Sequence, residues 1–338
     1  MAEKPVSDEM AKQLREAWFR YLDTIGPLRS SLYRYCRRMT RDIWDAEDLL
    51  QETLLKGFGG IGRGDLCGGP GAPVKDSRAY LFRIATNLWI DQVRRSQIRW
   101  EANAGAVSTP PEQAVSAREA ASVLLTHAAP QERAAVVLKD VFDFTLEEIA
   151  EMLTTTVGAI KSALHRGRAS VEETKGNRRS IFRAPSKELL DRFVEAFNAR
   201  DVGRVTELLL ENVTVEVPGV GGERGKNMIW VRSSMDLPTP NSPNPPRRER
   251  SAEVVLYHGE WIVVTWESPR SASILGSVAR FKEEDGHFAR IREYYYCPET
   301  LAEIAAELGA KPSHSAYHQT GEVLSGMIAS SRLPWITS

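Results

Sequence analysis

Residues 145–168, TLEEIAEMLTTTVGAIKSALHRGR, contain the side chains best suited to binding a polyanion. Two short helical patterns meet there with only a few threonines between them, and the second carries Lys161, His165, Arg166 and Arg168. Lysine and arginine on one helix face can contact guanine edges or phosphates in a DNA major groove, and a helix N-terminus also binds phosphate. An ordinary αα-hairpin with solvated charges has the same pattern, so the rest of the chain must decide between the two.

The boundary signals in this stretch predict a helix-turn-helix. Thr145 is a good N-cap, and Glu148 three positions later completes a capping box. Apolar residues then recur at helical spacing until residues 154–156, TTT, break the first helix. The second helix is predicted to bury three apolar residues, Val157, Ile160 and Leu164. The opposite face then holds Gly158, Lys161, Ser162, His165 and Arg168.

Helical patterns also precede this stretch. Helices are expected around residues 12–21 and 27–39, and a third begins at DAEDLLQETLLKGF, with Asp45 as N-cap and Asp48 three positions later. The glycine-rich run 59–77 is predicted to be a flexible loop. A helix resumes at SRAYLFRIATNLWIDQVRRSQIRW. Its expected core residues are Leu81, Phe82 and Trp89.

The overall composition excludes several classes of protein. The chain has 338 residues, of which 42% are hydrophobic and 26% charged, so it can form two or three packed domains. Its net charge of −1 excludes a uniformly basic protein that binds nucleic acid over its whole surface, so any DNA contacts must come from local basic patches. Three widely spaced cysteines favour a reducing cytoplasm over a disulfide framework. No signal peptide or membrane span is expected.

Four segments resemble extracytoplasmic-function (ECF) sigma factors of the sigma-70 family. TTTVGAIKSALHRGRA is similar to the second half of their region 4, and PQERAAVVLKDVFDFTLEEIAEML is similar to the first half. DAEDLLQETLLKGF resembles the region 2 helix that docks on RNA polymerase. SRAYLFRIATNLWIDQVRRSQ resembles the region 2 helix that opens and reads the −10 element. Order and spacing agree over about residues 12–173.

The resemblance implies a sigma factor that directs promoter-specific transcription initiation, with core polymerase (β′ clamp and β flap) and promoter DNA as partners. No cofactor is expected, and no His/Cys/Asp spacing suggests a metal site. The residues implied for −35 contacts are Thr156, Gly158, Lys161, Ser162, His165, Arg166 and Arg168. Those for −10 contacts are Arg83, Asn87, Asp91, Arg94 and Arg95. Those for core polymerase are Asp45, Asp48, Gln51 and Glu52, in an acidic cluster that also includes Glu47.

Two departures from the family pattern leave the promoter sequence open. Ala163 stands where the family commonly has arginine, which removes one expected major-groove contact. The run 59–77 is longer and less charged than usual, at the place where the family captures a flipped −10 base.

After Pro185 the pattern changes to two helices, a series of β-branched and alternating runs, and a last helix at LAEIAAELG. LLDRFVEAFNARDVGRVTELLLENVTVEVPG and FARIREYYYCPETLAEIAAELG resemble the SnoaL-like cone, a curved sheet closed by helices. The expected fold is therefore multidomain: an all-α region 2 and region 4, then an α+β cone. The expected ranges are 10–100 for region 2, 101–116 for a linker, 117–175 for region 4, 176–185 for a second linker, 186–310 for the cone and 311–338 for a tail.

The cone is expected to control activity through intramolecular contact with the sigma regions, and the chain is not expected to be an enzyme. Free-standing relatives of the cone use an Asp/His pair, but the sequence does not bring the candidates together. The segment GVGGERGKN lacks the spacing of a phosphate loop, so an inter-domain contact and a simple loop both stay open. The alternative functions are a stand-alone helix-turn-helix regulator with a ligand-binding domain, or a cyclase-like enzyme with a DNA-binding extension. The candidate acid–base residues are Asp201, His258, Glu267, His287 and Glu293.

Overall fold

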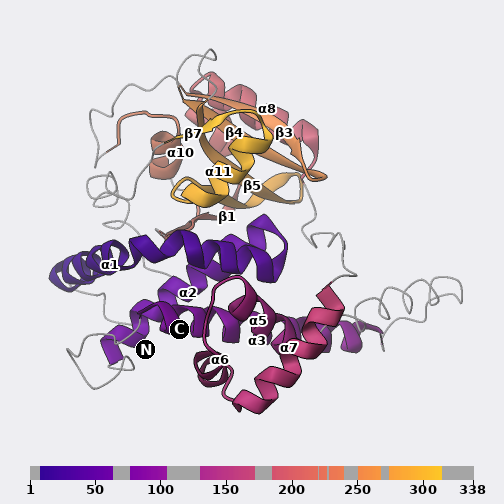
Figure 1. Cartoon of the computed structure of the whole chain (residues 1–338). Coiled ribbons are helices and arrows are strands. Elements are labelled where there is room, and N and C mark those ends of the chain that lie inside the picture. Colours follow the sequence, from indigo (N-terminus) through magenta and orange to yellow (C-terminus); the bar gives the residue numbers. More distant parts are fainter. Residues whose placement is uncertain are drawn as a thin grey trace, which may run out of the picture. The chain divides into compact units, whose positions relative to one another are not determined.

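The computed structural model of the chain describes residues 8–63, 77–104, 130–171, 185–219, 221–226, 228–239, 250–267 and 274–313. The chain divides into two compact units, Met1–Arg178 and Arg179–Ser338 (Figure 1). Within the described ranges, no helix is both long enough and apolar enough to cross a membrane.

The described part of the first unit is helical. Its helices are α1 (Asp8–Thr40), α2 (Ile43–Arg63), α3 (Ser77–Ala104), α5 (Pro130–Asp140), α6 (Leu146–Met152) and α7 (Val157–Val171) (Figure 1).

The predicted break between two N-terminal helices is wrong, because α1 continues through Pro27. Proline removes one backbone hydrogen bond from a helix, but buried residues before and after it, such as Ile25 and Leu32, hold both halves in one packed element.

The start and end of α2 also differ from the prediction. Asp42, not Asp45, caps the helix, since its Oδ1 accepts hydrogen bonds from the backbone N–H groups of Trp44 and Asp45, each at 2.9 Å. The helix extends to Arg63, so the beginning of the run predicted as a loop is helical, and the rest of that run, 64–76, lies outside the described residues. Helix α3 likewise extends to Ala104, into the predicted linker.

The core of α1, α2 and α3 is aromatic and aliphatic. Leu81, Phe82 and Trp89 are buried, which confirms their prediction as core residues. The hydroxyl of the fully buried Tyr35 lies 2.6 Å from Thr86 Oγ1, and burial raises the pKa of Tyr35. The second unit has its own separate core.

The second unit combines helices with one mixed sheet, which confirms the α+β prediction. Its helices are α8 (Lys187–Asn198), α9 (Val202–Glu207), α10 (Met228–Ser234) and α11 (Pro298–Glu307). Its strands are β1 (Leu209–Val217), β2 (Gly221–Arg224), β3 (Arg250–Tyr257), β4 (Glu260–Glu267), β5 (Ile274–Glu284), β6 (His287–Tyr294) and β7 (Lys311–Pro312). The strand order is β2-β1-β6-β5-β4-β3, with β7 paired to β5.

One segment of this unit is a strand where the sequence left an inter-domain contact and a simple loop open. Residues 221–224 of GVGGERGKN form β2, which pairs antiparallel with β1. The glycines concealed the strand because glycine has low strand propensity. At Gly222 an added Cβ would lie 3.2 Å from the Val215 carbonyl oxygen, so glycine allows the two strands to approach closely.

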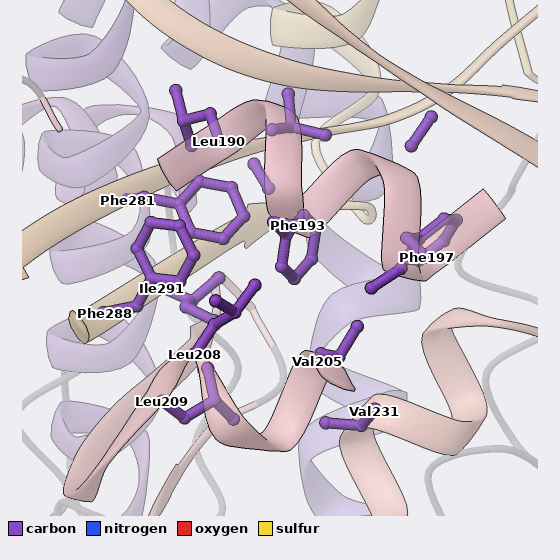
Figure 2. Close-up of a cluster of buried hydrophobic side chains, with 14 of the residues drawn as sticks. Leu190, Phe193, Phe197, Val205, Leu208, Leu209, Val231, Phe281, Phe288 and Ile291 are labelled. Atoms are coloured by element: carbon purple, nitrogen blue, oxygen red, sulfur yellow. The ribbon is translucent and has the colours of Figure 1, made fainter. Parts of the chain in front are cut away.

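The core of the second unit lies between the sheet and its helices. Figure 2 shows rings from α8, β5 and β6 that face one another: the Phe193 centroid lies 4.9 Å from that of Phe281, and the Phe281 centroid lies 4.7 Å from that of Phe288. Val205 of α9 and Val231 of α10 extend the same cluster. Aromatic rings in these geometries supply much of the burial energy of a small core.

Two side chains at the end of α8 bind the outer backbone of β3, the last strand in the sheet order. Asn198 Oδ1 accepts a hydrogen bond from the Ala252 N–H at 2.7 Å, and Asn198 Nδ2 donates to the Ala252 carbonyl oxygen at 3.0 Å. Arg200 Nη2 donates to the Arg250 carbonyl oxygen at 2.6 Å. Just after them, Asp201 caps α9, where its side chain accepts a hydrogen bond from the Arg204 N–H at 3.0 Å.

The carboxylate of Glu223 lies buried on β2. Glu223 pairs with Val215, whose side chain belongs to the core, and directly opposed residues on antiparallel strands share a face. Within the described residues, neither carboxylate oxygen has a hydrogen-bond partner. Burial raises the pKa of Glu223 above its ordinary value of 4.5.

This raised pKa predicts that the second unit loses stability as the pH rises. Between the unfolded and the folded pKa, the folded protein holds a proton that the unfolded chain has released, so the contribution is complete below pH 4.5 and lost as pH rises through the folded pKa. Glu223→Gln should remove this loss, so the variant gains on the parent in melting temperature between pH 4 and pH 8. Glu211→Gln, which changes an exposed carboxylate on β1, should show no such gain. Parallel melting curves for parent and Glu223→Gln would contradict the prediction.

Candidate nucleic-acid interface

Helices α6 and α7 form the predicted helix-turn-helix. Thr145 Oγ1 accepts a hydrogen bond from the Glu148 N–H at 3.2 Å, and the Thr145 N–H donates to Glu148 Oε2 at 2.6 Å, which confirms the capping box. Ile149 and Ile160 are buried, one from each helix, so apolar packing sets the angle between the helices. At the start of α7, Thr156 Oγ1 accepts a hydrogen bond from the Ala159 N–H.

The outer face of α7 is polar and accessible. The predicted −35 residues Thr156, Gly158, Lys161, Ser162, His165, Arg166 and Arg168 are all exposed. Ala163, by contrast, is buried. The position where the family commonly has arginine therefore belongs to the packing side of this helix.

A hollow lies beside this face, between α5, α6 and α7. Its volume is about 370 Å³. Leu146 and Leu164 give it apolar walls, and the other lining residues are Lys139, Lys161, His165 and Arg168. No carboxylate is among the lining residues. The hollow thus brings together the basic groups that can bind a phosphate.

Lys139 was missed by sequence reasoning. It lies in the last turn of α5, where a lysine is explained by the helix dipole alone. Its Nζ donates to the Phe144 carbonyl oxygen at 3.1 Å, which holds the side chain beside the hollow. Only the tertiary packing of α5 on α7 places it near Lys161.

The two arginines of α7 are tied to acids of α5. Arg166 Nε donates to Glu132 Oε1 at 2.5 Å, and Arg168 donates to both carboxylate oxygens of Asp140, at 2.9 and 2.6 Å. The hydrogen bonds from Arg168 lower the pKa of Asp140. These arginines therefore join α5 to α7. Within the described residues, Lys161 and His165 of the same face have no carboxylate partner.

Helices α5 and α7 approach closely at Gly167, which predicts a large effect of one methyl group. An added Cβ would lie 2.7 Å from Val136 Cγ2 and 2.9 Å from the Glu132 carbonyl oxygen. Alanine gains about 1 kcal/mol of helix propensity, but overpacking costs about 1–3 kcal/mol, and backbone cannot move aside cheaply. Gly167→Ala should therefore lower the free energy of unfolding by up to about 2 kcal/mol in urea titrations.

Gly158 provides the matched control for stability. It lies in the same helix, and the nearest atom to an added Cβ is Thr156 Oγ1 at 3.9 Å. Gly158→Ala should leave the protein unchanged or more stable by about 0.4–1 kcal/mol. Equal effects of the two substitutions would show that the helices separate freely at Gly167.

The predicted −10 residues form a stripe along α3. Asn87, Asp91, Arg94 and Arg95 are exposed, and Arg83 is half-buried with its guanidinium 5.6 Å from the Tyr80 ring centroid. Their spacing of three and four residues places them on one side of the helix. The stripe offers basic groups to phosphates and one amide to a base.

The acidic cluster of α2 divides into exposed and buried members. Asp45 is exposed, and Asp48 and Glu52 are half-buried. Glu47 is fully buried and pairs with Arg29 at 3.2 Å. Gln51 is also buried and donates to Glu47 Oε1 at 2.6 Å. Gln51 thus holds Glu47 and does not face outward, so a docking surface for a partner can use only Asp45, Asp48 and Glu52 from the predicted set.

The acid–base candidates of the second unit do not form a His–carboxylate pair with one another. His258 Nε2 lies 2.7 Å from Glu307 Oε2 at an exposed turn, and His287 Nδ1 lies 2.9 Å from the Asp285 carbonyl oxygen. Glu293 is buried, and its carboxylate accepts from Trp230 Nε1 and Ser277 Oγ. These three side chains are thus engaged by groups outside the candidate set.

Arg250 pairs with two carboxylates of the second unit, Asp236 and the candidate Glu267. Its guanidinium lies 3.2 Å from Asp236 and 3.4 Å from Glu267, and it donates to the Tyr295 hydroxyl at 3.1 Å. No group of three or more metal-ligating side chains occurs in the described part of the chain.

Comparison with known proteins identifies the helical segments. A family model described as Sigma-70 region 2 matches residues 25–98, and one described as Sigma-70, region 4 matches residues 118–171. ECF RNA polymerase sigma factor SigL of Mycobacterium tuberculosis (strain ATCC 35801 / TMC 107 / Erdman) is 32% identical over 141 residues, which cover 40% of this chain and 76% of SigL.

Two further similarities extend beyond these segments. ECF RNA polymerase sigma factor SigG of Mycobacterium tuberculosis (strain CDC 1551 / Oshkosh) is 28% identical over 235 residues, 58% of this chain, and the match spans 60% of the length of SigG. The crystal structure of the Mycobacterium tuberculosis extracytoplasmic function sigma factor SigJ aligns with 83% of this chain and 98% of its own, at 23% identity and a TM-score of 0.28. With both sigma-70 regions matched in order, and with 32% identity across 76% of SigL, the chain belongs to the family of ECF RNA polymerase sigma factors.

Proposed function

We propose that the chain is a promoter-specificity subunit of RNA polymerase and not itself an enzyme. Region 2 (residues 10–100) opens and reads the −10 element, and region 4 (117–175) reads the −35 element. The observation that carries this proposal is the exposed polar face of α7 beside a hollow with four basic side chains, in a chain of the ECF family. The protein acts in the cytoplasm, on the nucleoid when bound to polymerase.

In the proposed −35 complex, α7 enters the major groove. Lys161 and His165 reach base edges, since they lie on the exposed face without an acidic partner among the described residues. Lys139 and Arg168, which line the same hollow, hold the phosphate backbone. Arg166 contributes positive charge and fixes α7 on α5 through Glu132.

In the proposed −10 complex, the α3 stripe lies along the opened strand. Arg94 and Arg95 hold phosphates, Asn87 contacts a base, and Asp91 and Arg83 flank it.

Core polymerase binds α2, a different helix of region 2. The exposed carboxylate of Asp45, with Asp48 and Glu52, meets a basic surface of the β′ clamp, while region 4 docks on the β flap.

Run-off transcription with core polymerase over a random promoter library tests the proposal. Parent protein should enrich templates with a shared −35 and −10 sequence. Asp45→Lys should weaken binding to core polymerase. Glu188→Lys reverses the charge of an exposed side chain on α8 and should leave this binding unchanged. Enrichment of a single DNA element without dependence on core polymerase would favour a stand-alone helix-turn-helix regulator.

The second unit has a proposed regulatory role. We expect the cone (186–310), joined by the linker 176–185, to contact the sigma regions within the same chain, and the tail 311–338 to add to that contact. A short tether gives effective concentrations of roughly millimolar, so even a weak interface is well populated. Transcription by stepwise truncations, first without 311–338 and then without 186–338, tests this role. Parental activity from both truncations would exclude it.

A further inference from the structure

The segment between α5 and α6, residues 141–145, packs its two phenylalanines into region 2. The Phe142 ring centroid lies 5.6 Å from that of Tyr35 in α1 and 5.1 Å from that of Phe82 in α3. The Phe144 centroid lies 5.2 Å from that of Phe82. All four rings are buried. Region 4 therefore completes an aromatic cluster that region 2 begins.

Arginines on both sides strengthen this contact. Arg78 of α3 donates from Nη2 to the Phe142 carbonyl oxygen at 2.5 Å, and its guanidinium carbon lies 4.2 Å from the Phe144 ring centroid. Arg133 of α5 donates to the Arg38 carbonyl oxygen at the end of α1, at 2.6 Å, and lies 5.6 Å from the Trp89 ring centroid. Stacking and hydrogen bonding by the same guanidinium fix both distance and orientation.

The contact leaves both proposed DNA faces uncovered. Asn87 and Arg94 of α3 are exposed, while Phe82 and Trp89 of the same helix are buried. On α7, Lys161 and Ser162 are exposed as well. The contact therefore acts on the distance between the two faces and not on their accessibility.

The proposed DNA faces of α3 and α7 lie too close together to reach both elements of one promoter. Helix α7 packs on α5, and α5 packs on α1 and α3. Packed helices lie about 8–10 Å apart, so α7 lies within roughly 20 Å of α3. The −35 and −10 elements are named for positions about 25 base pairs apart, which is roughly 85 Å at 3.4 Å per base pair. In this arrangement region 2 and region 4 cannot both reach their elements on the same DNA.

We propose that Phe142 and Phe144, in the segment between α5 and α6, act as an intramolecular latch, which holds regions 2 and 4 in a closed state that must open before the protein can engage a promoter. This inference rests on the proposed sigma function. Core polymerase shifts the equilibrium because it binds only the separated regions, and its differential affinity for the two states must exceed the stability of the latch. Phe142 is the central latch residue, because its ring lies close to the rings of both Tyr35 and Phe82 in region 2.

Energy transfer between dyes on the full-length chain tests the latch. Ser96 of α3 and Glu151 of α6 are exposed and lie outside the proposed binding sites, so Ser96→Cys and Glu151→Cys provide the labelling positions. Cys36 and Cys297 are buried, and Cys67→Ser removes the remaining thiol.

Phe142→Ala should raise the ratio of open to closed molecules by roughly tenfold or more, since loss of a buried ring far exceeds thermal energy. Arg78→Gln should act in the same direction from the region 2 side. Val141→Ala is the matched control, because Val141 is adjacent in the chain and 39% exposed. Both latch variants should also bind core polymerase more tightly and give more run-off transcript when polymerase is limiting.

The outcomes separate the latch from the sigma function. Unchanged energy transfer in Phe142→Ala and Arg78→Gln overturns the latch. Opening accompanied by weaker core binding also overturns it, since the contact would then support the active pose. Opening in both variants, with no transcription from parent or variants, supports the latch as a conformational device and contradicts the proposed function.

Discussion

Glu47→Ala is expected to lower the free energy of unfolding of the first unit by about 3–5 kcal/mol, the typical cost of removing one partner from a buried ion pair. The substitution leaves the guanidinium of Arg29, which is 5% exposed, without its carboxylate at 3.2 Å. It also removes the acceptor for Gln51 Nε2. Urea titration followed by circular dichroism measures the loss.

Two controls define the origin of this effect. Glu52→Ala removes a half-exposed carboxylate from the same helix, and its pair with Lys56 is exposed, so the expected cost is below about 1 kcal/mol. Arg29→Met with Glu47→Leu removes both charges and should recover most of the loss, because a packed apolar pair avoids the desolvation penalty. If Glu47→Ala costs no more than Glu52→Ala, the buried pair contributes nothing to stability.

Lys161→Ala is expected to weaken binding to −35 DNA by about 1–3 kcal/mol, the range for one good contact to a base edge. Lys161 is exposed on α7 and lines the basic hollow, so its loss should leave the melting temperature unchanged. Fluorescence anisotropy with a labelled −35 duplex measures the affinity. Lys56→Ala is the control, because it removes an exposed lysine from α2, outside the proposed −35 interface.

The dependence on sequence and salt assigns the type of contact. If Lys161 reads a base, the loss is confined to duplexes with the preferred base at one position. If it binds a phosphate, all duplexes weaken equally and the salt slope falls by about one. Equal affinities of Lys161→Ala and parent for all duplexes would remove α7 from the DNA interface.

Local signals were sufficient to predict the helix-turn-helix. The Thr145–Glu148 box and the apolar spacing around it are fixed by neighbours three and four residues apart, so the sequence displays them directly. The alternating runs after Pro185 predict strands for the same reason, because alternation is local, and Gly259 and Gly286 at positive φ form the turns between β3 and β4 and between β5 and β6. The DNA-contact and polymerase-contact roles of individual residues stay predictions.

Features set by distant partners could not be predicted. Glu47 stands among the acidic residues Asp45 and Asp48, and the sequence does not distinguish it from them. It is buried because Arg29, 18 positions away on another helix, donates a hydrogen bond to its carboxylate. Lys139 joins the hollow only through the packing of α5 on α7. Strand β2 forms because β1 supplies its partner, against the low strand propensity of its glycines.

The side chains of Asn198 and Arg200 have a consequence for how the second unit meets other molecules. An edge strand with open backbone groups is a template on which a foreign strand can add, which leads to peptide capture or to aggregation. On β3 the outward groups of Ala252 and Arg250 already bind these two side chains. An incoming strand would have to displace three hydrogen bonds to pair with residues 250–252, so this part of the edge resists sheet extension by a second copy of the chain.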